Sequence, residues 1–381
     1  MAEERIELLS PAGDEEKLIM ALEYGADAVY LSGRNYGMRA SNANFSDEQL
    51  LKAVELVHEK GKKIYVTCNT LPREDEIKEL PRYLEFLDSS KVDALIIADL
   101  GVLKLANKYA PNCAKHVSTQ LGVVNSETAN FLQELGADTA VLARECSIDE
   151  IRAISSNTTI RLEAFVHGAM CVSFSGRCLL SNYMAGRDAN RGKCAQPCRW
   201  KYHLVEEQRP GEYFEISEDQ GTYILNSNDL RMIEHLDELK DAGISSFKIE
   251  GRMKSAYYTA ITTNAYRHVM DEGLSDIWVK ETEMVSHRPY STGFFYGYPG
   301  QHYGTSSYTQ SAEIVAVVED NQKLSLRNKF FEGEQLEIIT PKQKPVPFIS
   351  EINSGNKPLE IFEMNLPVQA PKYSIIRRIK K

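Results

Sequence analysis

The sequence contains no long uninterrupted apolar run. None of its apolar stretches approaches the roughly 20 residues that span a bilayer. The start of the chain also lacks a secretory signal, because Glu3, Glu4, Arg5 and Glu7 stand where such a signal needs apolar residues. The sequence therefore predicts a soluble, cytoplasmic protein whose thiols are reduced.

Cysteine is scarce but clustered. Only seven cysteines occur among 381 residues, and four of them lie within residues 171–198. Disulfides belong to oxidising compartments and small stapled domains, whereas a chain of this length can bury a large core. The clustering therefore points to a soft metal centre. The other three cysteines sit in or beside apolar runs and are predicted to be buried small hydrophobes: Cys68, Cys113 and Cys146.

The four clustered cysteines are separated by six, fifteen and three residues. Zinc ribbons use two tight Cys-x-x-Cys knuckles, which this segment lacks, whereas iron–sulfur clusters accept looser spacings because each thiolate reaches a different iron. An iron–sulfur cluster is the favoured interpretation, and structural zinc and metal-free thiols remain open alternatives. The four candidate ligands are Cys171, Cys178, Cys194 and Cys198.

Positive charge is in deficit overall but is concentrated near these cysteines. The chain has 44 Lys and Arg against 54 Asp and Glu, a formal net charge of -10, which argues against a protein coated by nucleic acid. A local basic site remains compatible with this balance, and a solvated arginine-rich loop explains the charges equally well. From Arg177 to Lys201, the further basic residues are Arg187, Arg191, Lys193 and Arg199, against the single acid Asp188.

Several catalytic signatures are missing. The chain has neither the Gly-x-Ser-x-Gly nucleophile elbow nor the His-Glu-x-x-His metalloprotease motif, and no glycine-rich dinucleotide turn. A thiol hydrolase needs a base beside its nucleophile, and His167 lies four residues before Cys171. A structural role, in which His167 is hydrogen-bonded at a strand end, explains this residue equally well. The sequence alone therefore does not establish a catalytic pair of Cys171 and His167.

Short apolar runs alternate with amphipathic stretches from Glu7 onward, which is typical of a β/α fold. Eight predicted strands fit a closed, TIM-like β/α barrel over residues 1–290, with a cysteine-rich insertion at about 168–201. Short alternating runs after Pro289 predict a small all-β domain over residues 300–381. The predicted barrel strands are Glu7–Ser10, Ala28–Leu31, Lys63–Cys68, Ala94–Ala98, His116–Thr119, Thr139–Ala143, Arg161–Val166 and Ser246–Ile249.

Polar residues follow the predicted strands, where a parallel barrel places its chemistry. The cysteine segment follows one of these strands, the one that ends near Val166, and so obeys the same rule. Any single residue of the set is as well explained by an ordinary loop as by a site. The set is Tyr30, Asn69, Asp99, Gln120, Arg144, Glu145, Glu163, His167, Asn226, Lys248, Glu250 and Arg252.

Several motifs along the chain resemble the signature of the peptidase U32 family. They are Glu163-Ala-Phe-Val-His-Gly-Ala-Met-Cys171, Ser175-Gly-Arg-Cys-Leu-Leu-Ser181, the opening Glu7-Leu-Leu-Ser-Pro-Ala-Gly13, Asn226-Ser-Asn-Asp-Leu230 and Phe247-Lys-Ile-Glu-Gly-Arg-Met-Lys254. The resemblance covers essentially the full chain. Although the family carries an old label as collagenase-like proteases, the present chain is most similar to a branch that hydroxylates tRNA.

This resemblance implies prephenate-dependent, oxygen-independent C5 hydroxylation of a wobble uridine in tRNA, with a 4Fe-4S cluster as cofactor. Alternatives are a U32-type peptidase and a non-catalytic subunit that assembles with a paralogue; a homo-oligomer is also compatible with the sequence. Some relatives place a cluster cysteine where this chain has Arg231, so Cys198 is the nearest candidate for the fourth ligand.

The expected site residues follow from these motifs. Lys248 and Glu250 are expected to form an ion pair that leaves Glu250 as a proton acceptor, and a guanidinium suits carboxylate or phosphate binding. Tyr183 or Trp200 would stack on a base, although core packing explains Trp200 at least as well. The expected catalytic residues are Glu250, Lys248 and His167, and the expected substrate-binding residues are Arg177, Arg191, Arg199 and Asn226.

Overall fold

A computed structural model describes most of the chain. The described residues are 5–37, 44–171, 173–200, 204–205, 213–214, 227–299, 308–341, 343–355 and 357–380. Asn226, expected to bind substrate, lies outside these ranges. Within the described part, no helix is both long enough and apolar enough to cross a membrane.

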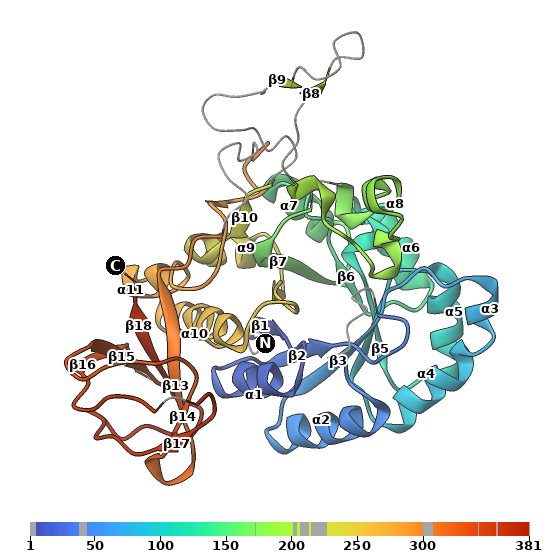
Figure 1. Cartoon of the computed structure of the whole chain (residues 1–381). Helices are drawn as coiled ribbons and strands as arrows, with labels where there is room; N and C mark the ends of the chain where they lie inside the picture. Colours follow the sequence, from blue (N-terminus) through green and yellow to red (C-terminus); the bar gives the residue numbers. More distant parts are fainter. Residues whose placement is uncertain are drawn as a thin grey trace.

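Eight parallel strands close into a barrel, which confirms the predicted fold class (Figure 1). Closure is made by β11, which pairs with β1 on one side and β7 on the other. The barrel strands are β1 (Glu7–Pro11), β2 (Ala28–Leu31), β3 (Lys63–Cys68), β4 (Ala94–Ile97), β5 (Ala114–Val117), β6 (Thr139–Val141), β7 (Arg161–Ala169) and β11 (Ser246–Ile249).

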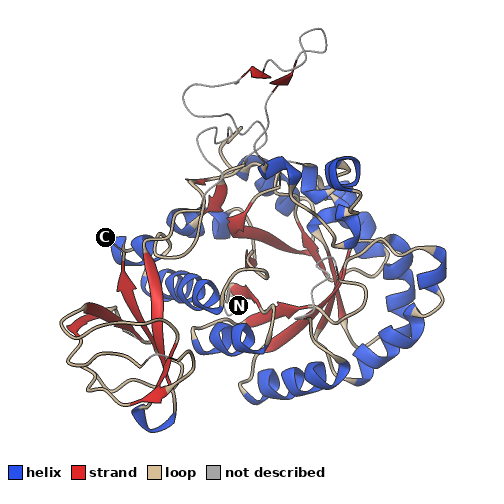
Figure 2. Cartoon of the chain, in the orientation of Figure 1, coloured by secondary structure: helices blue, strands red, loops and turns tan. Residues whose placement is uncertain are grey.

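Helices surround the strands on the outside (Figure 2). Side-chain caps define several of their starts; for example, Ser46 and Gln49 form a capping box, as do Ser147 and Glu150. The helices of the barrel are α1 (Glu15–Glu23), α2 (Asp47–Glu59), α3 (Glu74–Ile77), α4 (Leu80–Ser89), α5 (Leu100–Tyr109), α6 (Ser126–Glu134), α7 (Ile148–Ser156), α9 (Leu236–Asp241), α10 (Ala256–Glu272) and α11 (Asp276–Glu281).

The cysteine segment and two added strands follow β7. The segment is built of short turns, namely η2 (Phe174–Gly176), α8 (Leu180–Ala185), η3 (Ala189–Arg191) and η4 (Pro197–Arg199). Strand β10 (Asp229–Arg231) then runs antiparallel to β7 and pairs with β12 (Tyr290–Ser291). Strands β8 (Leu204–Val205) and β9 (Tyr213–Phe214) pair antiparallel with each other.

A separate antiparallel sheet forms the C-terminal end, as the alternating runs predict. Its order is β16-β15-β18-β13-β14-β17, and Figure 1 shows it beside α1 and α10. Buried residues of this sheet, including Val317 and Ile375, join the same hydrophobic cluster as the barrel helices. The strands are β13 (Ala312–Val318), β14 (Leu324–Leu326), β15 (Gln335–Ile339), β16 (Val346–Ile349), β17 (Ile361–Phe362) and β18 (Ile375–Ile379).

Candidate functional site

A cavity of about 1260 Å³, part of it open to solvent, lies at the carboxyl ends of the barrel strands. The cysteine segment forms one wall, and residues in or directly after the strands form the rest. Eight polar residues singled out at the strand ends line it: Tyr30, Asn69, Gln120, Arg144, Glu145, Lys248, Glu250 and Arg252.

All four clustered cysteines line this one cavity, although 26 residues lie between the first and the last. Cys171 is exposed, and the other three are half-buried. By contrast, Cys68, Cys113 and Cys146 are buried, as predicted. The fold therefore sorts the thiols into three core residues and four that face a common space.

Backbone amides point at two of the four sulfurs. The N–H of Leu180 donates to Cys178 Sγ at 3.3 Å, and the N–H of Gln196 donates to Cys194 Sγ at 3.4 Å. Gln196 adopts a left-handed conformation, with φ of 58°, in the turn that makes this contact. Such hydrogen bonds stabilise thiolate character, which metal ligation requires.

The donor set suits a cluster better than a single ion. Within the described residues, no group of three or more His, Cys, Asp or Glu side chains is arranged to hold one metal ion. A tetrahedral zinc site draws all its ligands to one point, whereas a 4Fe-4S cluster spreads four thiolates over four irons. Four thiols that line one cavity are a donor set of the kind that such a cluster uses.

Without a metal, two of these thiols are poor nucleophiles. Desolvation raises the pKa of Cys171 and of Cys198, and the neighbouring cysteines raise both further. Since the thiolate is the attacking species, a raised pKa disfavours a cysteine hydrolase. Ligation by a cation is the ordinary way to hold such a group deprotonated.

Two carboxylates from barrel loops bind the cysteine segment. Glu145, after β6, accepts hydrogen bonds from Ser175 N at 2.6 Å and Ser175 Oγ at 2.9 Å. Ser175 has φ of 46°, an uncommon conformation for a residue with a side chain. Glu76, in α3, makes a bidentate ion pair with Arg191 at 2.9 and 2.5 Å. The guanidinium of Arg191 therefore serves the docking of this segment.

The cavity floor carries a buried ion pair that differs from the expected one. Lys248 Nζ lies 2.6 Å from Glu163 Oε1, and both side chains are almost fully buried. The expected pairing of Lys248 with Glu250 is wrong, because Glu163 on the neighbouring strand β7 takes the ammonium group of Lys248 instead. Glu250 instead accepts a hydrogen bond from the N–H of Arg252 at 3.3 Å.

Gly168 explains how Glu250 reaches the cavity. Its φ is +108°, and a Cβ at this position would lie 2.4 Å from the carbonyl oxygen of Glu250. Only glycine permits both the conformation and the close approach. The Glu250 N–H also donates to the carbonyl of His167 at 2.8 Å, so the ends of β7 and β11 are joined directly.

Two arginines bring positive charge to the cavity. Arg144 Nη1 donates to the carbonyl of Ala169 at 2.7 Å, and its guanidinium lies 3.9 Å from the centroid of the Phe165 ring. Its Nε is buried without a hydrogen-bond partner. Arg252 is buried and donates to Thr67 Oγ1 at 3.2 Å. Together they offer a site for a carboxylate.

His167 lies away from the cavity. It is 1% exposed, its Nδ1 is 3.2 Å from Tyr266 Oη, and its Nε2 is 3.4 Å from Tyr290 Oη. Burial lowers its pKa, and the positive charge of Arg231 lowers it further. The geometry supports the structural interpretation of His167.

Arg231, where the family resemblance implies a cluster cysteine, likewise contacts residues other than the thiols. On β10, it forms ion pairs with Glu234 and Glu283 and packs over the ring of Tyr290. It is not among the residues that line the cavity, whereas Cys198 is. The fourth thiol of the cavity is therefore Cys198.

The other expected substrate-binding arginines have separate positions. Arg177 is exposed outside the cavity wall, and Arg199 Nη1 contacts Gln196 Oε1 at 2.9 Å and Tyr308 Oη at 2.8 Å. Sequence reasoning missed Thr67, Ser118 and Thr119, which line the cavity. Each lies in or directly after the end of a strand, and the same position identified the other polar residues of the cavity from the sequence.

The geometry lacks a hydrolytic constellation. Among the described residues, no histidine is hydrogen-bonded to a serine, threonine or cysteine side chain. The same part of the chain has no site for a single catalytic metal ion. The nucleophile–base pair of a serine or cysteine peptidase is therefore absent from the described residues.

A β/α barrel with a thiol-lined cavity at its carboxyl end, joined to a small β domain, is the class of protein that this geometry defines. The chain belongs to peptidase family U32, whose model matches residues 13–304; the model of the U32 C-terminal domain matches residues 310–377.

Relatives within this family carry different names. The tRNA hydroxylation protein P1 of Bacillus subtilis (strain 168) is 36% identical over 390 residues, covering 98% of this chain and 92% of that protein. A 23S rRNA 5-hydroxycytidine synthase of Escherichia coli (strain K12) is 35% identical over 358 residues, covering 89% and 53%. A collagenase of Porphyromonas gingivalis (strain ATCC BAA-308 / W83) is 32% identical over 311 residues, covering 76% and 73%.

Proposed function

We propose that this protein is an oxygen-independent RNA hydroxylase that forms 5-hydroxyuridine at the wobble position of tRNA. Prephenate is the proposed oxygen source, and a 4Fe-4S cluster on the four cavity cysteines is the proposed cofactor. The observation that carries the proposal is the convergence of Cys171, Cys178, Cys194 and Cys198 on one cavity that cations and amides also line. The names of two relatives, a tRNA hydroxylation protein and a 5-hydroxycytidine synthase, support RNA and carbon 5 of a pyrimidine.

The side chains of the cavity have distinct roles in this proposal. A bound cluster supplies one-electron chemistry that ordinary side chains lack. Arg144 and Arg252 hold a carboxylate of the oxygen donor, because guanidinium groups bind carboxylates with directed hydrogen bonds. Glu250 accepts the proton that leaves carbon 5 of the uracil ring. The oxygen donor then transfers its hydroxyl group to carbon 5, keeps the two electrons of the broken carbon–oxygen bond and takes up that proton. Lys248 pairs with Glu163 at 2.6 Å and thereby holds the floor in place.

An amide pair on the same wall suits recognition of a base. Asn69 Nδ2 donates to Gln120 Oε1 at 3.1 Å, and Ser118 Oγ approaches the same oxygen at 3.4 Å. These contacts fix the orientation of the two amides. Amide groups can satisfy both the donor and the acceptor groups on the edge of a uracil ring.

The experiment is nucleoside analysis of bulk tRNA by mass spectrometry after deletion of the gene, in a strain without any other route to 5-hydroxyuridine. We expect loss of 5-hydroxyuridine and its derivatives, restored by the wild-type gene but not by Cys171→Ala. Cys68→Ala, which removes a buried core thiol, is the matched control and should restore the product. An unchanged nucleoside profile after deletion contradicts the proposed substrate.

Metal analysis tests the cofactor separately. Protein purified without oxygen should contain iron and sulfide in nearly equal amounts, and Cys198→Ala should lower both. Stoichiometric zinc without sulfide would instead favour a structural metal site. Peptidase activity is the rival suggested by the collagenase name, and highly purified protein is expected to leave denatured collagen intact.

A further inference from the structure

The cysteine segment carries exposed aromatic side chains close in sequence to residues that line the cavity. Phe174 is 55% exposed, Tyr183 80% and Trp200 42%. Apolar side chains of this size gain by burial, so several of them together on one short segment mark a binding surface. The exposure of Trp200 also removes the core-packing alternative.

Each of these aromatic residues adjoins the cavity wall. Phe174 stands between the lining residues Ser173 and Ser175. Tyr183 lies on α8, whose first residue, Leu180, lines the cavity, and Trp200 is two residues beyond the lining residue Cys198. Helix α8 and turn η4 pack against each other, which brings the Tyr183 and Trp200 regions onto one surface.

Cations are interleaved with these rings. Arg177, Arg187 and Lys193 are exposed, and none of the three forms an ion pair with another described residue. From 171 to 200 the segment has five basic residues and one acidic residue, within a chain of net charge -10. This basic segment is therefore the part of an otherwise acidic protein that attracts a polyanion.

We infer that Phe174, Tyr183 and Trp200, with Arg177, Arg187 and Lys193, form an aromatic–basic rim that binds an unpaired RNA loop and delivers one base to the cavity. This inference rests on the proposed function and adds the surface that recognises the RNA. Aromatic rings stack on bases that are free of their neighbours, whereas a paired RNA helix buries its base faces. A cavity at the base of the rim receives the extruded nucleotide.

Direct binding measurements test the rim. Fluorescence anisotropy under anaerobic conditions would measure the affinity of the holoprotein for two RNAs. One is a short hairpin whose open loop carries one uridine, and the other is a fully paired duplex of equal length. We expect the hairpin to bind more tightly than the duplex. Trp200→Ala and Tyr183→Ala should each weaken hairpin binding about tenfold while leaving duplex binding nearly unchanged, because base stacking is lost.

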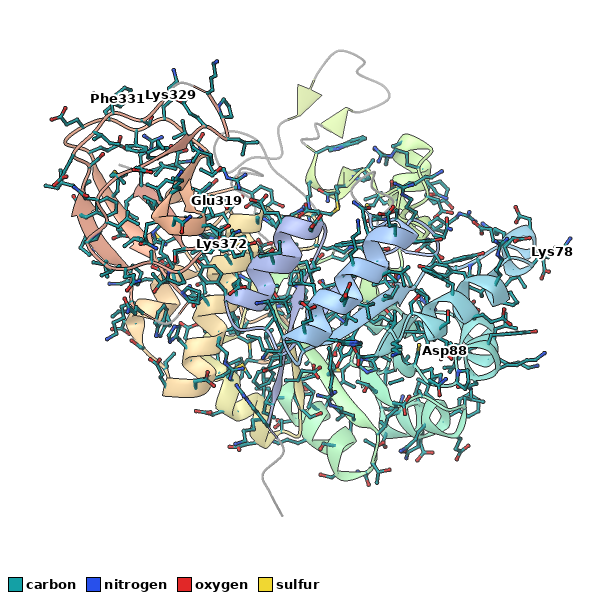
Figure 3. The ribbon with its side chains drawn as sticks, turned by 90° about the horizontal axis from the view of Figure 1, so that it is seen from below. Lys78, Asp88, Glu319, Lys329, Phe331 and Lys372 are labelled. Carbon is teal, nitrogen blue, oxygen red and sulfur yellow. The ribbon has the colours of Figure 1, made fainter. Side chains whose placement is uncertain are left out.

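Two further variants separate stacking from charge and from folding. Trp200→Phe should retain most of the affinity for the hairpin. Lys193→Ala should weaken the binding of both RNAs and reduce the dependence of their affinity on salt concentration. The matched control is Phe331→Ala, a 62% exposed ring on the C-terminal domain, labelled in Figure 3 beside Lys329. It should change neither affinity nor iron content.

Several outcomes overturn the inference. Equal binding of hairpin and duplex, or unchanged hairpin binding by Trp200→Ala and Tyr183→Ala together, rejects the rim even when gene deletion removes 5-hydroxyuridine. In that case the proposed function stands and RNA binds elsewhere. If the wild type binds neither RNA but binds denatured collagen, and deletion leaves the nucleosides unchanged, the proposed function fails as well.

Discussion

At the scale of single residues, the barrel interior tolerates ionisable groups only when they are paired or neutral. Lys248 and Glu163 illustrate the first case, with a 2.6 Å contact and almost no exposure. His116 illustrates the second case: burial lowers its pKa to about 3, and the positive charge of Lys248 adds to this effect. Its ring packs edge-on against Tyr65, with centroids 4.6 Å apart.

His116 makes stability depend on pH. In the unfolded chain its pKa is about 6.5, so above that value both states are neutral and the group has no effect. Below it, the unfolded state binds a proton that the folded state does not, and the free energy of unfolding falls by up to about 1.4 kcal/mol per pH unit. Guanidinium denaturation of metal-free protein from pH 8 to pH 5 would measure this decline.

The histidine variant shows how much of the decline belongs to His116. We expect His116→Gln to flatten the decline below pH 6.5 without abolishing it, because the pKa of buried His167 is also lowered. His58→Gln, which changes a half-exposed histidine, is the control and should leave most of the slope unchanged. The same slope in His116→Gln as in the wild type would contradict the assignment.

At the scale of elements, repeating patterns could be predicted and long-range docking could not. The predicted bounds of β2, β3 and β11 agree with the structure, because each strand is a short apolar run bounded by turn residues. Helix α9 has six residues, under two turns, so its periodicity is too short to identify it. The four cavity cysteines could likewise be named from their clustering alone.

The pairing of side chains across the site depends on geometry that the sequence does not display. Ser175 and Glu145 are 30 residues apart, and Arg191 and Glu76 are 115 apart. Glu76 lies in the short helix α3 among other acids, and nothing in the sequence marks it as the partner of Arg191. Glu145 can be named only as one of many polar residues that follow a predicted strand. The expected Lys248–Glu250 pair fails for the same reason, since the partner of Lys248 is Glu163, 85 residues away on the neighbouring strand β7.

The contact between Glu145 and Ser175 predicts an effect on cofactor retention. Glu145→Gln removes the charge from two hydrogen bonds, and a bond to a charged group contributes roughly 1.5–3 kcal/mol. We expect the segment to loosen, with faster loss of iron to a chelator and faster proteolysis within residues 171–200 of metal-free protein. Glu134→Gln, at an exposed helix end, should change neither rate. Wild-type rates in Glu145→Gln would show that Ser175 is held by other contacts.

At the scale of the whole molecule, the barrel and the C-terminal sheet are joined by buried polar contacts. Tyr24 Oη on α1 donates to the carbonyls of Ile339 at 3.2 Å and Tyr373 at 3.1 Å. Arg377 on β18 forms a bidentate pair with Glu281 of α11 at 2.7 and 2.6 Å. With the shared apolar cluster, these contacts predict that the two parts unfold together.

Neighbouring arginines on β18 allow a direct test of this junction. Arg377 and its partner Glu281 are 2% and 5% exposed, whereas Arg378 pairs with Glu313 and Glu334 at a half-exposed position. Removing one partner of a buried pair leaves an uncompensated charge, so Arg377→Met should lower the free energy of unfolding by about 3–5 kcal/mol. Arg378→Met, the same change one residue later, should cost about 1 kcal/mol or less.

Calorimetry and a second substitution decide whether this cost arises at the junction. Arg377→Met should split a single unfolding transition into two, since the C-terminal sheet loses its main polar contact with α11. Arg377 holds two carboxylates, and adding Glu281→Met removes the more deeply buried one while Glu337 remains. The double variant should recover part of the lost stability, because apolar replacements of a buried pair are often neutral or stabilising. Equal losses in Arg377→Met and Arg378→Met, or no recovery in the double variant, would mean that the apolar contacts alone hold the two domains together.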